Sequence, residues 1–132
     1  MITDEYFSLV EKLVHRTSQG EVNWKSTSDN HQFLVYFNKF TLSVSQSFDQ
    51  HNQEAYIRIV LLNDEGSEID SFWVHESDNH WELASQLFTG ARRKALQIDE
   101  AIHTIMDELD NKDTVGKKEL PIKEEFDDGI PF

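Results

Sequence analysis

The stretch of sequence that decides the fold is HQFLVYFNKFTLSVS, residues 31–45. Its first half places Phe33 and Phe37 on one face of a strand and Tyr36 on the other, which is the two-residue period of β-structure. The pair Asn38-Lys39 is a suitable two-residue hairpin connection. Apolar and polar side chains alternate again after this turn. The stretch therefore predicts two antiparallel strands joined by a tight turn.

Further strands are predicted on both sides of this hairpin. The segment around Trp24 alternates between apolar and polar residues before it. After it, a polar loop over 46–54 leads to residues 55–62, which are apolar on both faces, as in a central strand. A Gly-containing turn then leads to a last strand over 67–74. Five strands with short connections predict an antiparallel meander.

An amphipathic helix is predicted before the strands, over residues 4–17. Its apolar side chains recur at helical spacing, and its charged side chains face away from that stripe. Thr3 is a suitable N-cap, and Gly20 is typical of the end of a helix.

A second, long helix is predicted after the strands, from His80 to Leu109. Asn79 and Glu82 have the spacing of a capping box at its start. Gly90 interrupts the helical pattern and allows a bend. The apolar stripe of this helix either covers the sheet or pairs with a second copy of the chain, so a homodimer is one expectation.

The expected organisation is therefore an α+β domain over residues 1–109, a charged linker over 110–123 and a flexible acidic tail over 124–132. A barrel that binds oligonucleotides is not expected, because such a barrel begins with strands. The net charge is −13, and residues 1–109 carry −10 of it, with 8 Lys and Arg against 18 Asp and Glu. A protein that binds phosphates usually has a basic face, so this charge disfavours direct binding of nucleic acid.

The last nine residues of the chain, EEFDDGIPF, combine acidic and apolar side chains. Phe132 offers an aromatic ring and the chain-terminal carboxylate on one residue, which suits an apolar pocket with a rim of Arg or Lys. Pro131 fixes its own φ and biases Ile130 toward an extended conformation, so less freedom is lost on docking. Asp127 and Asp128 steer the segment toward a basic surface.

This ending resembles the C-terminal tip of bacterial single-stranded-DNA-binding proteins, which usually ends in acidic residues followed by Ile or Leu, Pro and Phe. The resemblance covers residues 126–132, and Gly129 stands where an acidic residue is more common. In that family the tip recruits helicases, nucleases, polymerase subunits and recombination mediators. The resemblance implies a cytoplasmic protein of a bacterium or phage that docks on such partners. The alternative is an acidic disordered tail that aids solubility.

A second resemblance covers much of the domain. The strand at Trp24 and the segments 91–96 and 99–101 resemble a scattered group of small uncharacterised bacterial and phage proteins. That resemblance implies no activity.

Two groups of residues in the domain are candidates for contact with nucleic acid. Tyr36 and Trp73 are the strand aromatics best placed to be exposed, where they can stack on unpaired bases. The alternative is that the aromatic side chains fill the core beneath the helices. Arg92, Arg93 and Lys94 form the basic cluster of the domain and can contact phosphates, or acidic residues of a partner or of the tail. A solvated helix face is the alternative for this cluster.

Nothing in the sequence predicts an enzyme. The six histidines show no HExxH spacing, no Gly-x-Ser-x-Gly or phosphate-binding glycine loop is present, and there is no cysteine. We therefore expect no catalytic residue, no metal and no cofactor. No apolar run is long enough to span a bilayer, and the N-terminus does not read as a secretory signal.

Three functions are compatible with these features. The first is an accessory protein of DNA replication, repair or recombination that docks through its tip on DNA-metabolism proteins with a basic-rimmed apolar pocket. The second is a non-barrel protein that binds single-stranded DNA with its sheet aromatics. The third is an acidic inhibitor, immunity protein or DNA mimic that binds a basic partner through its domain.

Overall fold

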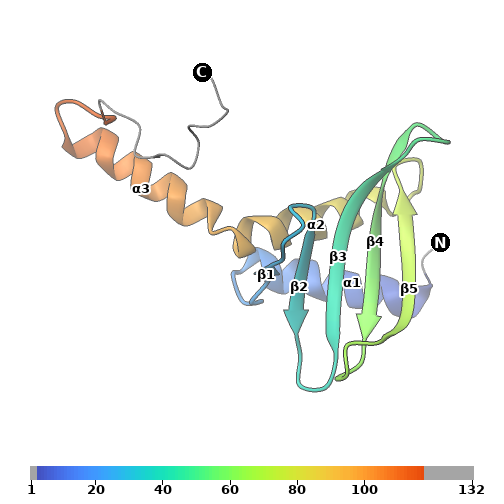
Figure 1. Cartoon of the computed structure of the whole chain (residues 1–132). Helices are drawn as coiled ribbons and strands as arrows, with labels where there is room; N and C mark the ends of the chain where they lie inside the picture. The colour runs from blue at the N-terminus through green and yellow to red at the C-terminus, as the bar shows by residue number, and fades with distance from the viewer. Residues whose placement is uncertain (1–2, 118–132) are drawn as a thin grey trace, which may run out of the picture. The chain divides into compact units, whose positions relative to one another are not determined.

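The computed structural model describes residues 3–117 of the chain, and Figure 1 shows their arrangement. The elements follow one another as α1 (Asp4–Ser18), β1 (Lys25–Ser26), β2 (Gln32–Tyr36), β3 (Thr41–Asp49), β4 (Glu54–Leu62), β5 (Glu68–His75), α2 (Trp81–Ala95) and α3 (Ile98–Asn111). The α+β class predicted from the sequence is confirmed.

The five strands form one antiparallel sheet in the order β1-β2-β3-β4-β5, so the predicted meander is confirmed. The turn between β2 and β3 closes when the amide of Phe37 donates to the carbonyl of Phe40 at 2.8 Å. The strand β3 runs to Asp49, farther than expected, because its polar end continues to pair with β4 as far as Glu54. A register shift at Leu61/Leu62 marks a bulge between β4 and β5.

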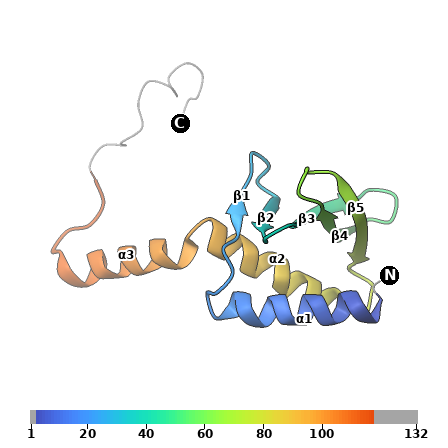
Figure 2. The ribbon, with the colours of Figure 1, turned by 90° about the horizontal axis from the view of Figure 1, so that it is seen from below.

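Both α1 and α2 lie on the same side of the sheet, as Figure 2 shows. The core therefore fills the space between these two helices and one face of the sheet. Its buried apolar residues are Val10, Leu13, Val22, Trp24, Phe33, Val35, Leu42, Val44, Ile57, Ile59, Phe72, Val74, Ala84, Leu87, Phe88 and Ala91. Burial of this apolar surface is the main favourable contribution to folding.

The first helix begins and ends much as expected. The hydroxyl of Thr3 accepts a hydrogen bond from the amide of Tyr6 at 3.3 Å, which confirms the predicted N-cap. Gly20, just past the helix, has φ +74°, a conformation that glycine adopts without strain. Tyr6 also ties this helix to the sheet, because its hydroxyl lies 2.5 Å from a carboxylate oxygen of Asp70. That hydrogen bond, together with burial and the Asp70 charge, raises the pKa of Tyr6 to about 12.

The crossing of α1 and α2 depends on Gly90 and Thr17. A side-chain carbon on Gly90 would lie only 2.8 Å from the Thr17 methyl group, so the two helices approach each other closely here. The hydroxyl of Thr17 accepts a buried hydrogen bond from the indole nitrogen of Trp24 at 3.0 Å. Gly90 thus serves close packing of the two helices, and α2 continues through it to Ala95.

The single long helix expected over 80–109 is two helices. The break lies at Leu96 and Gln97, where Gln97 has φ +56° and its amide donates to the carbonyl of Lys94 at 3.2 Å. A residue in this left-handed conformation is a common way to end a helix. The expected capping box is also absent, because His80 is the N-cap of α2 and caps no amide with its side chain.

The chain divides into two compact units, which meet at Asp99 and Glu100. The first unit contains the sheet, α1, α2 and the core. The helix α3, most of which belongs to the second unit, has no buried residue. None of the helices between residues 3 and 117 has both the length and the apolar character needed to cross a membrane. The remaining linker residues and the tip, 118–132, lie outside the described part.

Candidate functional site

The face of the sheet opposite the two helices carries the exposed aromatics predicted from the sequence. Tyr36 is 62% exposed and Trp73 is 47% exposed. Register places them on the same face. Gln32 is paired in one row with Ser45, Arg58 and Trp73, and Tyr36 lies four residues after Gln32 on the same strand, so its side chain points to the same side. The strand aromatics are therefore divided, with Phe33 and Phe72 in the core and these two outside it.

Tyr36 and Trp73 lie at opposite corners of this face. Three strand spacings of ~4.8 Å and four residues of ~3.3 Å separate them, which places their Cα atoms on the order of 20 Å apart. Tyr36 borders a hollow between α1 and β2, with Lys12 and Arg16 at its rim. The two aromatics therefore cannot stack on the same base, although they share one face of the sheet.

A second hollow lies at Trp73 on the open face. It has a volume of about 450 Å³ and is lined by Phe48, Asp49, Gln50, Tyr56, Arg58, Trp73 and His75. Aromatic side chains beside a guanidinium are suited to a flat, anionic or polar ligand. The Arg58 guanidinium, however, makes two hydrogen bonds to the Glu68 carboxylate, at 3.0 and 3.1 Å. A ligand phosphate would have to compete with this carboxylate.

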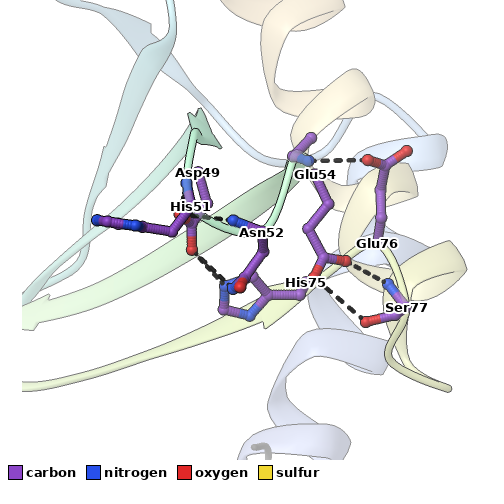
Figure 3. A network of polar contacts seen from close by, with 8 residues as sticks. Asp49, His51, Asn52, Glu54, His75, Glu76 and Ser77 are labelled. Carbon is purple, nitrogen blue, oxygen red and sulfur yellow. Dashed lines mark hydrogen bonds and ion pairs between the residues drawn. The ribbon is translucent and has the colours of Figure 1, made fainter.

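The floor of this hollow joins a polar network at the β3–β4 turn, which Figure 3 shows. One carboxylate oxygen of Asp49 accepts from the amides of His51 and Asn52, at 2.9 and 3.4 Å. The other oxygen accepts from the Asn52 side chain at 3.0 Å and lies 3.7 Å from Nε2 of His75. The His75 ring in turn lies 5.4 Å from the ring of Tyr56.

The same network fastens the segment after β5 to the start of β4. A carboxylate oxygen of Glu76 accepts from the amide of Ala55 at 2.8 Å. The Glu54 carboxylate accepts from the amide of Ser77 at 3.0 Å and from its hydroxyl at 3.4 Å. These carboxylates are occupied by backbone amides, so the network holds a turn and a strand end in place.

The basic cluster lies on the other side of the molecule from this face, on α2. Arg93 forms an ion pair with Asp99, and Nζ of Lys94 donates to the carbonyl of Gly20 at 3.2 Å. Arg92 is exposed, and within residues 3–117 its side chain makes no hydrogen bond or ion pair. The structure therefore does not bring Arg92, Arg93 and Lys94 together with Tyr36 and Trp73 on one surface.

Sequence reasoning identified Trp73 but missed the side chains around it. Arg58 and Tyr56 lie on the neighbouring strand, with Arg58 directly opposite Trp73 and Tyr56 opposite His75. The sequence feature that could have identified these neighbours is the turn from Asn63 to Gly66, because this turn sets which β4 residues lie opposite β5. The bulge at Leu61/Leu62 shifts that register beyond what the turn alone would give.

The remaining predictions concern metal binding and the docking segment at the end of the chain. Between residues 3 and 117, no three His, Asp or Glu side chains are grouped to hold a metal ion. The docking residues Asp127, Asp128, Ile130, Pro131 and Phe132 lie outside the described part of the chain. Comparison of the chain with known protein families, with curated proteins and with solved structures gave no match.

Proposed function

We propose that the protein is a cytoplasmic adaptor in DNA replication, repair or recombination. It docks through its C-terminal segment on enzymes that receive the tip of single-stranded-DNA-binding proteins. The observation that carries this proposal is the sequence of the segment, in which Asp127 and Asp128 precede Ile130, Pro131 and Phe132. An aromatic side chain with a free carboxylate fits an apolar pocket rimmed by Arg or Lys, and the acidic pair steers the approach. The proposal requires a free carboxylate on Phe132.

The position of the core supports a separate role for the C-terminal third. Among residues 3–117, the buried apolar core lies between Val10 and Ala91. None of the residues 100–117 is buried. The described core is therefore complete without residues 100–117, so changes in that segment should cost the domain little stability.

Charge supports the adaptor over a protein that binds DNA directly. Residues 1–109 carry a net −10, and two cations of the candidate surfaces are engaged by carboxylates, Arg58 by Glu68 and Arg93 by Asp99. Binding to a phosphate backbone gains its free energy from cations that displace counterions. Exposed Tyr36 and Trp73 are the specific observation that keeps single-stranded-DNA binding as the second candidate function.

Binding to a purified helicase or nuclease that receives the tip of a single-stranded-DNA-binding protein tests the adaptor. The full chain should bind with a Kd near 1 μM, or about −8 kcal/mol, and a tip peptide should displace it. Deletion of 130–132 should weaken binding more than tenfold, as should one residue added after Phe132. Phe48→Ala is the matched control, because it removes an exposed aromatic of the domain, 55% accessible. Equal affinity of the deletion and the full chain would refute the adaptor.

An electrophoretic shift assay with oligo-dT at low salt distinguishes direct binding of single-stranded DNA from the adaptor function. Direct binding predicts a shift that Trp73→Ala weakens and that deletion of 130–132 leaves unchanged. The acidic inhibitor or DNA mimic gives a third pattern, in which a basic partner still binds the chain without its tail. The adaptor predicts no shift at micromolar protein.

A further inference from the structure

The helix α3 carries an apolar stripe along one side. Its members are Ile98, Ile102, Ile105 and Leu109, and successive members are four, three and four residues apart. This is the spacing of the seam positions of a coiled coil. Ala101 and Met106 lie beside the stripe and widen it.

The stripe is exposed within the described chain. Ile102 is 42% accessible, Ile105 is 58% and Leu109 is 57%, and none of the 14 residues of α3 is buried. An isolated helix of this length is marginal in water, more so with three β-branched isoleucines. Several large apolar side chains on one side of such a helix mark a surface that another helix or groove covers.

The placement of charge on α3 shows which occupant fits. The helix has five acidic residues and no Lys or Arg, and its acids are Asp99, Glu100, Asp107, Glu108 and Asp110. Glu100 and Asp107 fall opposite the stripe, where they point away from any helix packed on it. The residues that flank the seam are Asp99 and Met106 on one side, and Ala101 and Glu108 on the other.

A second copy of α3 fits this pattern when it runs antiparallel. Ile98 then packs against Leu109 of the second copy, and Ile102 against its Ile105. In that register Asp99 faces a methionine and Glu108 faces an alanine, so no two carboxylates meet across the seam.

The relative orientation of the two α3 helices follows from the positions of their acidic residues. Asp107, Glu108 and Asp110 lie in or beside the last turn of α3, which has no basic residue. A parallel pair would bring both acidic ends together. An antiparallel pair separates them by about 15 Å along the helix axis, well beyond the screening length of ~8 Å. It also places each acidic end near the positive end of the other helix dipole.

We propose that α3 is a self-association helix, whose stripe packs against α3 of a second copy in antiparallel orientation to form a two-fold symmetric dimer. The contact is isologous, because the same residues serve on both copies. A dimer of this kind carries two C-terminal segments. If the adaptor function holds, these segments bind a multivalent partner with higher avidity than one segment alone. The dimer itself does not depend on that function.

Sedimentation of the full chain from about 5 μM to about 500 μM tests the dimer. The mass should rise to twice that of the monomer with concentration. The double variant Ile102→Ser/Ile105→Ser should shift this transition more than tenfold upward in concentration. The control His103→Ser/Asp107→Ser changes the same helix away from the stripe and should dimerise like the wild type. A chain that stays monomeric throughout, or a dimer that the stripe variant leaves intact, overturns the proposal.

The salt dependence of binding distinguishes a second copy of α3 from a partner protein with a basic groove. Two copies of net charge −13 repel each other, so dimerisation should strengthen between about 0.05 M and about 0.5 M salt. A basic groove would bind α3 less tightly at the higher salt. A dimer that dissociates as salt rises contradicts an apolar seam.

Orientation is testable because the chain has no cysteine. Antiparallel pairing predicts a disulfide-linked dimer when the Ile98→Cys chain is mixed with the Leu109→Cys chain. Either variant alone should form little of it. Efficient cross-linking of Leu109→Cys with itself would overturn the antiparallel arrangement. Deletion of 130–132 should leave the dimer unchanged, so failure of the adaptor function and failure of the dimer are distinguishable.

Discussion

Gly90→Ala is the substitution for which local and tertiary effects oppose each other most clearly. Alanine in the interior of a helix is favoured over glycine by about 1 kcal/mol. The added carbon, however, would lie 2.8 Å from the Thr17 methyl group, closer than packed carbon atoms approach. Thr17 is β-branched and stiff, and its hydroxyl is engaged by the Trp24 indole. The methyl group cannot turn away without loss of that hydrogen bond.

Overpacking of this kind typically costs about 1–3 kcal/mol. Set against a propensity gain of about 1 kcal/mol, it predicts that Gly90→Ala lowers the free energy of unfolding by roughly 0–2 kcal/mol. The next nearest atom to the added carbon is Thr17 Cβ at 3.8 Å, an ordinary contact distance. Removal of the methyl group should therefore relieve the whole clash.

The double variant Gly90→Ala/Thr17→Ser isolates this contact. Thr17→Ser keeps the hydroxyl for Trp24 and deletes the methyl group, so Gly90→Ala in this background should stabilise the chain by about 1 kcal/mol. Urea unfolding followed by circular dichroism, at dilute protein, gives all four corners of the cycle. The expected coupling is about 1–3 kcal/mol. A coupling below about 0.3 kcal/mol, with Gly90→Ala stabilising the wild type, would refute the close approach.

Three further substitutions test the core, the helix break and the Tyr6 contact. Leu87→Ala should cost about 2–5 kcal/mol in urea unfolding, because Leu87 is fully buried. Gln97→Gly should stabilise the chain by about 0.5–1 kcal/mol, since it relieves a left-handed residue at φ +56°, and Gln97→Val should destabilise it. The pKa of Tyr6 is raised from 10.0 to about 12 by its hydrogen bond to Asp70, so the stability it contributes is fully present below pH 10 and is lost between pH 10 and about 12. Tyr6→Phe should remove the part of the alkaline transition in this window, as measured by thermal melts against pH. An alkaline transition of the same size in Tyr6→Phe would contradict the contact.

The sheet could be predicted because its signals are local. Alternation from Phe33 onward separates core from open face, and the short turns leave antiparallel neighbours as the simplest pairing. The outer position of Tyr36 and Trp73 follows from the same alternation. The alternation places Phe37 on the same face as buried Phe33. The strand β2 ends at Tyr36, however, so Phe37 lies in the turn and is 49% exposed.

The helix break could not be predicted, because the apolar spacing continues across it. Ala95 and Ile98 are three residues apart, and Ile98 and Ile102 are four, so the pattern of one helix is preserved through Leu96 and Gln97. Neither residue at the break is Gly or Pro. The packing role of Gly90 could not be predicted either, because it depends on a neighbour 73 positions earlier in the sequence, Thr17, which only the packed helices reveal.

The hollow at Trp73 could not be predicted for the same reason, because its residues come from different strands. Its cation and its second aromatic come from β4, and they reach Trp73 through a register that a bulge shifts. That Arg58 is engaged by Glu68 could not be read from their separation in the sequence. Pairing of this sort decides whether a basic residue is available to a phosphate, so composition alone overestimates the cations free to bind.

Opposite responses to salt allow the two proposals to be tested in one titration. Docking of the C-terminal segment joins Asp127 and Asp128 to a basic rim, so its affinity should fall as salt rises. Dimerisation through α3 joins two acidic chains along an apolar seam, so its affinity should rise over the same range. At high salt the full chain should therefore be dimeric and poorly bound to the enzyme. If both affinities fall together, a single charged contact explains both, and the separation of recognition from self-association is wrong.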